Sequence, residues 1–306
     1  MNLSGIIIIY KEKGMTSHDV VWHLRKIIGM KKIGHTGTLD PDAEGVLPVA
    51  LGSATRLCDL MNENDKKYRC VMRLGLTTTT QDLSGEVLTQ SAVDVSAEQI
   101  REAAEAFTGQ ITQVPPMYSA VKIGGKKLYE LARKGIEVER PSREVTIDEI
   151  DIEEINGNDV TMTVTCSKGT YIRTLCSDIG DRLGCGACMA SLVRLRAAGF
   201  EAGDAVTLDD VRRFMQEGSL TEHIIPTDSF FSEYSSVTVR PEEDKLLING
   251  NPFLRENLVL NPTDSSKEQV WTKKLRMYTS NGRFAGIYEK YGRRYKPWKM
   301  FISQQE

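Results

Sequence analysis

Three carboxylates, Asp40, Asp42 and Glu44, alternate along a short segment that glycine and proline interrupt. Residues 34–45 contain three glycines and one proline, which break both regular helices and long strands. The apolar run at residues 46–51 then predicts a buried element that anchors this loop. Acidic loops fixed to a hydrophobic anchor hold either catalytic carboxylates or cations in proteins.

The spacing of the three acids partly matches an EF-hand calcium loop. Counted from Asp40, acids and a glycine fall at the expected early positions, but the chelating Glu required at position 12 is replaced by Leu51. Pro41 also restricts the turn. This kind of calcium site is therefore excluded, and composition alone favours a solvated turn in which Asp40 caps backbone amides.

The whole chain has the composition of a soluble globular protein, with 306 residues, 40% hydrophobic and 26% charged. This length predicts one large domain or two. The concentrated apolar run at residues 6–9 is too short for a signal sequence or a membrane span, and no basic stretch precedes it. We therefore expect a buried strand there, a cytoplasmic protein and no membrane association.

Six cysteines in a chain of this length do not indicate a disulfide scaffold. Cys185 and Cys188 have the CxxC spacing of zinc and redox sites. No second CxxC and no HxxxH accompanies them, so we interpret the pair as coincidental and expect no metal site.

Charge is distributed unevenly along the chain. Residues 271–306 carry nine Lys or Arg and two Glu, although the net charge of the chain is −3. Aromatic residues are interleaved with these basic residues, a mixture typical of surfaces that hold phosphates and stack on bases. The aromatics could equally form the core of a small β-domain. Both interpretations hold together, because a strand alternates its faces.

Sequence patterns also predict the elements that position these residues. Capping boxes at Thr16 and Ser96 open two helices, the first ending at Gly29 and the second near Gly109. Alternation and helical spacing predict further strands at 6–10, 68–76, 145–155, 159–166, 237–239, 270–278 and 283–288, and helices at 171–183 and 207–218. Residues 228–236 resemble a linker, and the short strands beyond it predict a small β-barrel.

Residues 115–141 differ from both flanks. Prolines bound the segment, Gly124 and Gly125 interrupt it, and it carries six Lys or Arg and three Glu. This composition predicts a mobile basic loop with a short helix over residues 128–134.

The acidic segment closely resembles the active-site motif of the TruB family of tRNA pseudouridine synthases, of the stand-alone bacterial type. The likeness continues in order along most of the chain, and long collinear matches are far more specific than one short motif. The matching segments are 34–48 (GHTGTLDPDAEGVLP), 67–69 (KYR), 74–82 (LGLTTTTQD), 114–122 (VPPMYSAVK), 125–130 (GKKLYE) and 166–173 (CSKGTYIR).

The resemblance implies an α+β pseudouridine synthase fold. Such a fold has a mixed, mainly antiparallel central sheet flanked by helices, and a small PUA-like β-barrel follows it. It implies a catalytic domain over residues 1–235, with the basic RNA-gripping loop 115–141 inserted, and a PUA-like RNA-binding domain over residues 237–306. The likeness of the last part is weaker.

The implied activity is isomerisation of uridine 55 in the T-loop of tRNA to pseudouridine. The reaction proceeds by base flipping and an aspartate-dependent cleavage and re-formation of the glycosidic bond, with no metal or organic cofactor. The essential aspartate of the family corresponds to Asp40. The other implied site residues bind the substrate, and they are His35, Tyr68, Tyr171, Arg173 and Leu192.

Physical chemistry assigns roles to these side chains. A closed pocket favours the neutral acid, and a guanidinium within about 4–6 Å lowers a carboxyl pKa by roughly 1–3 units, so Arg173 is the expected partner of Asp40. An aromatic face returns about 1–3 kcal/mol per stacked base, which Tyr68 would supply. His35 would occupy the vacated stack in the RNA.

The expected partner is the T-arm of tRNA, held through its shape and splayed bases, with no obligate protein partner and a monomeric enzyme. The cations of the 115–141 loop expected to contact RNA are Lys122, Lys126, Lys127 and Arg133. Two alternatives share parts of this pattern. One is a guide-RNA-dependent pseudouridylase, which normally lacks the basic loop, and the other is a non-catalytic RNA-binding module or chaperone.

The chain departs from the family pattern at three places. Tyr10-Lys11-Glu12 stands where Asp-Lys-Pro is usual, which puts a supporting role of that strand in doubt. Cys188 replaces a common His, and Leu192-Val193-Arg194 replaces Leu-Arg-Arg. None of these changes affects Asp40, Tyr68, Tyr171 or Arg173.

Overall fold

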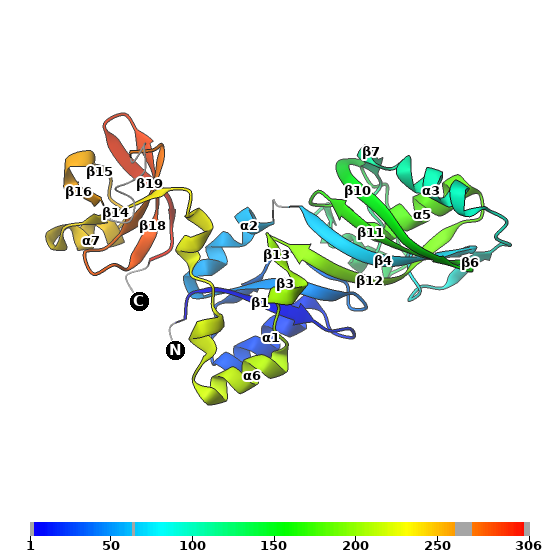
Figure 1. Ribbon diagram of the computed structural model, residues 1–306, viewed down its shortest axis with the longest axis horizontal. Coiled ribbons are helices and arrows are strands. Elements are labelled where there is room, and N and C mark those ends of the chain that lie inside the picture. Colours follow the sequence, from blue (N-terminus) through cyan, green and yellow to red (C-terminus); the bar gives the residue numbers. More distant parts are fainter. Residues whose placement is uncertain (1–2, 63–64, 261–270, 303–306) are drawn as a thin grey trace.

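The computed structural model describes residues 3–62, 65–260 and 271–302, and two β-sheets organise them (Figure 1). The first sheet has the order β1-β3-β12-β4-β11-β10-β7, with β2 beside β3 and β13 beside β12. Its pairs are antiparallel except β3 with β12, so the sheet is mixed but mainly antiparallel, as expected. Its strands are β1 (Gly5–Lys11), β2 (Ile33–His35), β3 (Glu44–Leu51), β4 (Lys66–Leu74), β7 (Gly109–Gln113), β10 (Arg143–Asn156), β11 (Asp159–Cys166), β12 (Ala187–Ala197) and β13 (Phe200–Glu201).

Helices cover the first sheet in two groups. Helices α3 (Ala97–Glu105) and α5 (Ile172–Leu183) pack over β4, β10 and β11, while α1 (Ser17–Ile28) and α6 (Leu208–Glu217) pack under β1 and β3. Both predicted capping boxes are present, with Thr16 and Ser96 accepting from backbone amides of the first turn. The second predicted helix ends at Glu105, because the glycine at 109 already begins β7.

The predicted strand at 68–76 is β4, and its alternation is confirmed. Tyr68, Cys70, Met72 and Leu74 are buried, whereas Arg69 between them is exposed. This alternation places one row of β4 side chains in the core beneath α5, next to the acidic loop.

A second, six-stranded sheet forms the C-terminal part, with the order β15-β19-β18-β17-β14-β16. Its strands are β14 (Ser235–Val239), β15 (Phe253–Leu254), β16 (Leu258–Leu260), β17 (Lys274–Tyr278), β18 (Phe284–Tyr291) and β19 (Arg294–Met300), with helix α7 (Asp244–Ile248) beside them. The barrel-like sheet confirms the PUA-like expectation. The strand predicted to begin at residue 270 begins at Lys274, and residue 270 lies outside the described residues.

The segment at 228–236 is not an open linker. A 3-10 turn spans Thr227–Phe231, and Phe231 is buried against Phe284 of β18 and Phe301, which directly follows β19. The composition of this segment is typical of linkers, but its aromatic side chains pack between the two sheets.

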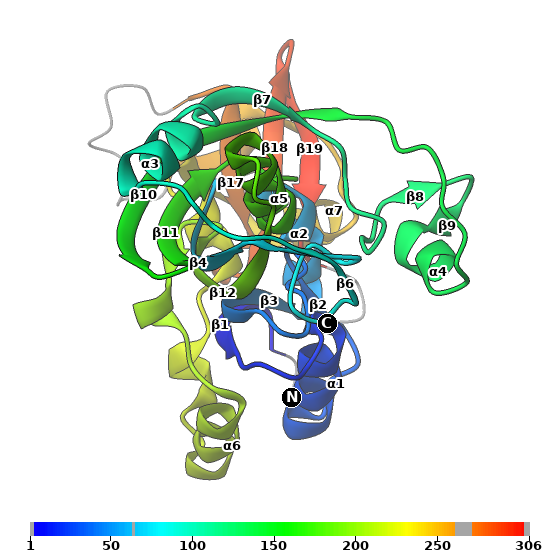
Figure 2. The same cartoon turned by 90° about the vertical axis from the view of Figure 1, so that its right-hand side faces the viewer.

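The 115–141 segment forms a separate arm that projects to the right in Figure 2. It contains the paired strands β8 (Lys122–Ile123) and β9 (Lys126–Lys127) and the short helix α4 (Leu128–Ala132). Another hairpin, of β5 (Leu76–Thr78) and β6 (Val87–Gln90), leaves the end of β4, and the short helix α2 (Cys58–Met61) follows β3. In the described part of the chain, no helix is both long and apolar enough to cross a membrane.

The parallel contact of β3 with β12 fixes where the acidic loop ends. Gly45 pairs with Arg194 at φ +108°, and a Cβ atom there would lie 2.2 Å from the Arg194 carbonyl oxygen. Only glycine allows the two strands to approach this closely.

We predict that Gly45→Ala lowers the free energy of unfolding by about 2–3 kcal/mol, because it adds a backbone clash to the strain of a positive φ. Gly29→Ala is the matched control, since Gly29 also has a positive φ (72°) but nothing within 4 Å of its Cβ position. Urea denaturation followed by circular dichroism measures both variants. Equal destabilisation of the two would contradict the proposed clash.

Candidate active site

A cavity of about 800 Å³ opens beside the acidic loop. Six parts of the chain line it: the start of α1, the acidic loop, the loop after β5, the 115–141 arm, the first turn of α5 and the middle of β12. The lining includes Asp40, Asp82, Tyr118, Arg173 and Leu192. It therefore gathers residues that are far apart in the sequence.

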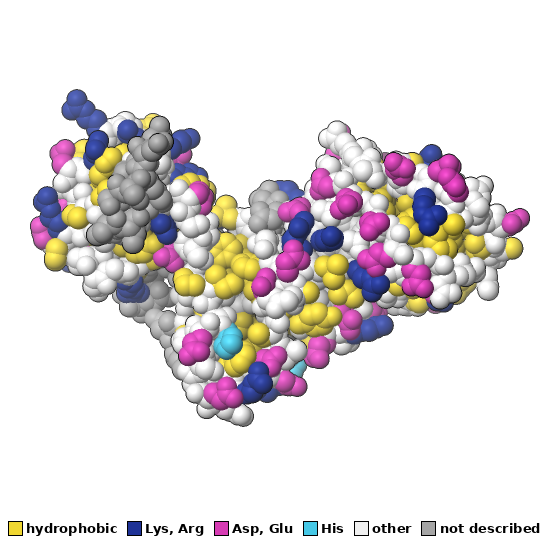
Figure 3. All heavy atoms as spheres, in the orientation of Figure 1, with side chains coloured by type: hydrophobic (Ala, Val, Ile, Leu, Met, Phe, Trp, Pro, Cys, Tyr) yellow, Lys and Arg dark blue, Asp and Glu magenta, His cyan; other side chains and the backbone are white. Residues whose placement is uncertain are grey.

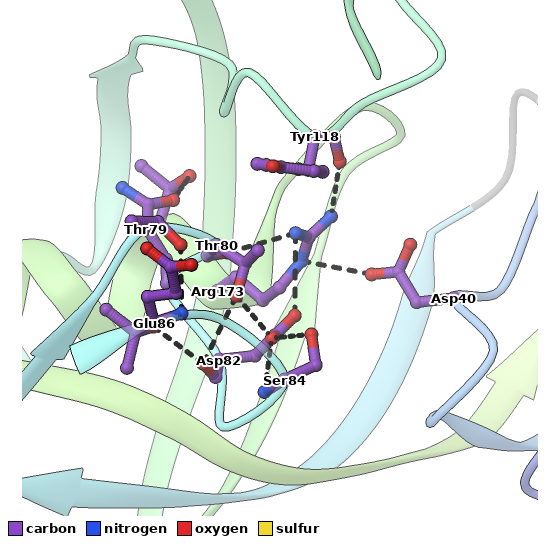
Figure 4. A network of polar contacts seen from close by, with 11 residues as sticks. Asp40, Thr79, Thr80, Asp82, Ser84, Glu86, Tyr118 and Arg173 are labelled. Atoms are coloured by element: carbon purple, nitrogen blue, oxygen red, sulfur yellow. Dashed lines mark hydrogen bonds and ion pairs between the residues drawn. The ribbon is translucent and has the colours of Figure 1, made fainter. Parts of the chain in front are cut away.

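Arg173 connects these parts through one buried guanidinium group (Figure 4). Its Nε lies 3.0 Å from Asp40 Oδ2, and its Nη1 lies 3.5 Å from Asp82 Oδ2. The same group donates to the carbonyls of Thr80 (3.1 Å) and Tyr118 (2.9 Å). Because the Arg173 side chain is only 6% exposed, it is a structural cation of the cavity wall and not a surface charge.

Asp82 is itself held in a tight turn. Its Oδ1 accepts from the hydroxyls of Thr80 (2.6 Å) and Ser84 (2.5 Å) and from the Ser84 amide (3.0 Å). The second oxygen is left to face Arg173. The turn thus orients Asp82 Oδ2 as an acceptor that keeps the Arg173 guanidinium in place while the Arg173 Nε faces Asp40.

The protonation of Asp40 reflects opposing influences. Enclosure by the cavity wall raises the pKa of the Asp40 carboxyl above its ordinary value, and the Asp82 charge adds to this effect. The Arg173 charge acts in the opposite direction and is the largest influence that favours the ionised carboxylate. Since 41% of the Asp40 side chain is exposed, the carboxylate remains accessible from the cavity.

Lys11 supports the acidic loop from below. Its fully buried Nζ donates to the carbonyls of Ala43 (2.6 Å), Glu12 (3.0 Å) and Pro41 (3.2 Å). Burial lowers the pKa of Lys11 to about 8, although Asp40 opposes this shift. Lys11 thus holds the acidic loop through backbone carbonyls, although its neighbours Tyr10 and Glu12 differ from those usual in the family.

Arg194 ties the acidic segment to Tyr68. Its guanidinium donates to the carbonyls of Val46 (2.7 Å) and Gly37 (3.1 Å), one on each side of Asp40. It also hydrogen bonds the Tyr68 hydroxyl, whose pKa burial raises. Tyr68 is buried in the same hydrophobic cluster as Leu39 and Leu192, beneath the cavity.

His35 lies at the end of β2, edge-on to His18, with ring centroids 5.2 Å apart. Its Nδ1 is buried and has no hydrogen-bond partner among the described residues. Burial lowers the pKa of His35 to about 4, and the neighbouring His18 and Arg194 add to the shift. The ring is therefore neutral near pH 7.

The structure brings some of the expected site residues together and leaves others outside the cavity lining. Asp40, Arg173, Leu192, Lys127 and Arg133 line the cavity. The other predicted residues do not contribute to its wall. Tyr68 lies beneath the lining, and His35 lies behind His18. Tyr171 caps α5 with its backbone bonded to Gln113, while Lys122 and Lys126 are exposed on the arm.

Three residues with clear structural roles at the site received no role from the sequence: Lys11, Asp82 and Arg194. Asp82 lies within the matching segment 74–82, which was a signal of its importance. The contacts of Lys11 and Arg194 depend on chain segments 30 or more residues away, so no local spacing identifies them.

No cluster of three or more His, Cys, Asp or Glu suited to a metal ion occurs within residues 3–62, 65–260 and 271–302. Cys185 and Cys188 are both buried free thiols, at 7% and 0% exposure.

Comparison with known proteins places this geometry in a family. Residues 25–172 match the N-terminal domain of the TruB family pseudouridylate synthases, and residues 173–232 match the C-terminal domain described for tRNA pseudouridylate synthase B. The fold and these matches thus define an isomerase of the pseudouridine synthase class. The chain belongs to the TruB family.

Relatives over nearly the full length support this assignment. The chain is 45% identical to tRNA pseudouridine synthase B of Lachnoclostridium phytofermentans over 98% of this chain and 100% of that protein. It is 43% identical to the protein of the same name from Clostridium perfringens, over 99% and 100%. The Bacillus pumilus protein of that name is 40% identical over 94% of each chain.

Solved structures share the fold. A Cbf5-Nop10-Gar1 complex contains a chain with a TM-score of 0.70 and 27% identity, covering 98% of this chain and 86% of that one. An H/ACA RNP bound to a substrate RNA that contains 2′-deoxyuridine contains another, with a TM-score of 0.68 and 25% identity over the same shares.

The partly buried His35 ring gives a pH-dependent prediction. With a folded-state pKa of about 4 against an ordinary 6.5, the unfolded chain binds more protons between these values, so the contribution of His35 to stability is lost as pH falls through that window. Proton NMR of the imidazole should show a midpoint near 4, and His35→Gln should lose less stability than the wild type between pH 7 and pH 5. A midpoint near 6.5 would show that the ring is not buried as described.

Proposed function

We propose that the protein converts uridine 55 in the T-loop of tRNA to pseudouridine without a metal or organic cofactor, with Asp40 as the catalytic residue. The observation that carries the proposal is the ion pair between accessible Asp40 and buried Arg173 in the wall of the cavity. The relatives named tRNA pseudouridine synthase B support tRNA as the substrate.

The reaction breaks the bond between C1′ and N1, turns the uracil and forms a bond between C1′ and C5. C5 then loses its proton and N1 gains one, so the atoms of the uridine are conserved. Asp40 must be ionised to act as a nucleophile or as a base, and Arg173 favours that form. A cavity of about 800 Å³ is large enough to enclose a flipped nucleotide and retain the detached base.

The remaining predicted residues take supporting roles in this proposal. Leu192 in the lining supplies apolar surface against which the base packs, and Tyr68, in the same hydrophobic cluster beneath the lining, stacks on the base once the nucleotide has moved in far enough to reach it. The neutral His35 fits a ring that enters an RNA stack, since a charged imidazole would cost more to desolvate there. Tyr171, the N-cap residue of α5, is bonded through its backbone to the Gln113 side chain, which holds the start of the helix that carries Arg173.

We assign RNA binding to two further parts. The 115–141 arm contributes Lys127 and Arg133 to the cavity wall, with Lys122 and Lys126 exposed nearby on the same arm. Residues 237–306 present exposed aromatics beside cations, such as Lys274 over Trp298 at 3.4 Å and Lys296 over Tyr291 at 4.3 Å. The presence of the arm favours a stand-alone enzyme over a guide-dependent one.

We predict that wild-type protein modifies a bare T-arm hairpin without guide RNA or any other protein, and that Asp40→Asn abolishes product while RNA affinity stays close to that of the wild type. Glu44→Gln, the same change of carboxylate to amide in the same segment, is the matched control and should retain activity. Quantification of pseudouridine by mass spectrometry and of affinity by anisotropy separates chemistry from binding. Turnover by Asp40→Asn near the wild-type rate would reject the assignment, and activity that requires a guide RNA would favour the alternative class.

A further inference from the structure

Helix α1 presents a second surface outside the cavity. Trp22, Arg25 and Lys26 are exposed on this helix, and Lys31 is exposed just beyond its end. Together with Gly29 and Met30 they line a shallow concavity. We call the exposed side chains of Trp22, Arg25, Lys26 and Lys31 the α1 stripe.

The α1 stripe lies in a segment of net positive charge. Residues 17–39 contain four Lys or Arg and one acid, Asp19, in a chain of net charge −3. Asp19 accepts the capping-box hydrogen bonds of Thr16 at the start of the helix, and its single negative charge leaves the segment with a net charge of about +3. By contrast, Asp and Glu side chains are spread among the basic ones over the face shown in Figure 3.

Trp22 is not part of the packing of α1. The helix packs into the core through Val20, Val21, Leu24 and Ile28, whereas Trp22 is 50% exposed. The Nζ atom of Lys26 lies 3.5 Å from the centre of the indole ring. An exposed ring beside cations is the arrangement that proteins use to hold the bases and phosphates of one nucleic-acid strand.

The stripe leads away from the cavity. His18 lines the cavity, Trp22 follows one helical turn later, and Lys26 follows one turn after that. The helix rises about 12 Å from His18 to Lys26. Arg25, also on this path, donates to the Ile33 carbonyl at 3.0 Å, which holds its guanidinium in position at the surface.

We propose that the α1 stripe binds the RNA strand that leaves the cavity next to the target uridine. Lys26 and Lys31 neutralise phosphates of that strand, and Trp22 stacks on one of its bases or sugars after Lys26 turns from the ring to a phosphate. The proposal rests on the proposed function, because it takes the occupant to be the same RNA whose uridine enters the cavity. Charge complementarity favours RNA as the occupant.

The test uses two pairs of variants of the full-length protein and an unmodified, fluorescein-labelled tRNA transcript. Lys26→Ala with Lys31→Ala removes two cations of the stripe, and Arg101→Ala with Arg182→Ala removes two exposed cations of α3 and α5. The stripe variant should bind the transcript about tenfold more weakly, and its slope of log affinity against log salt should fall by about 1.4 to 1.8. The control variant should match the wild type in both measurements.

The aromatic contribution has its own variants. Trp22→Ala should weaken binding, and Trp22→Phe should restore most of the loss, because a phenyl ring still stacks. The single-turnover rate at saturating enzyme should stay at the wild-type value in every stripe variant, since none of these side chains lines the cavity. Thermal unfolding monitored by circular dichroism confirms that each variant is folded.

Unchanged RNA affinity and salt slope in the stripe variants would overturn the proposal and leave the stripe to another partner, such as an acidic protein surface. Equal losses in the stripe and control variants would also overturn it, since they would show only a general charge effect. Failure of the proposed function gives a different result: the wild type would bind the transcript but form no pseudouridine.

Discussion

The site depends on one buried cation between two carboxylates. Arg173 is nearly inaccessible to solvent, and its position is fixed by Asp82 and by backbone carbonyls from two different loops. A guanidinium buried in this way is stable only if its donors are satisfied, so the loops that supply the acceptors are held in place along with it. Asp40 faces the remaining Nε donor, and that contact favours the ionised carboxylate against the effect of burial, which raises the pKa of Asp40.

Two further buried cations, Lys11 and Arg194, hold the backbone of the acidic loop in place in the same way, through the carbonyl groups that accept their hydrogen bonds. Lys11 holds the loop through carbonyls on both sides of Asp42, and Arg194 holds the segment on both sides of Asp40. The close parallel contact of β3 with β12 at Gly45 brings Arg194 under the loop. Asp40 is therefore positioned by rigid strands and buried charges and not by the turn alone, which suits a catalytic group that must keep its geometry while RNA enters and leaves.

Sequence reasoning succeeded where the determinants are local. The capping boxes at Thr16 and Ser96 depend on residues three positions apart, and the alternation of β4 depends on residues two positions apart. The structure confirms both. The pairing of Asp40 with Arg173 came from the family resemblance and a pKa argument, and their 3.0 Å contact confirms it. The roles of Lys11 and Arg194 were missed because their partners are distant in sequence. The 228–236 segment was interpreted as a linker because its composition does not reveal that Phe231 packs between aromatic rings of the second sheet.

The central claim is that Arg173 keeps the carboxyl group of Asp40 ionised. Carbon-13 NMR of labelled aspartate side chains measures the pKa of Asp40 directly, with the resonance assigned by its loss in Asp40→Asn. The account predicts that the pKa of Asp40 is higher in Arg173→Met than in the wild type, and that Arg69→Met, which removes an exposed guanidinium, leaves it unchanged. An Asp40 pKa that is unchanged or lower in folded Arg173→Met would contradict the account.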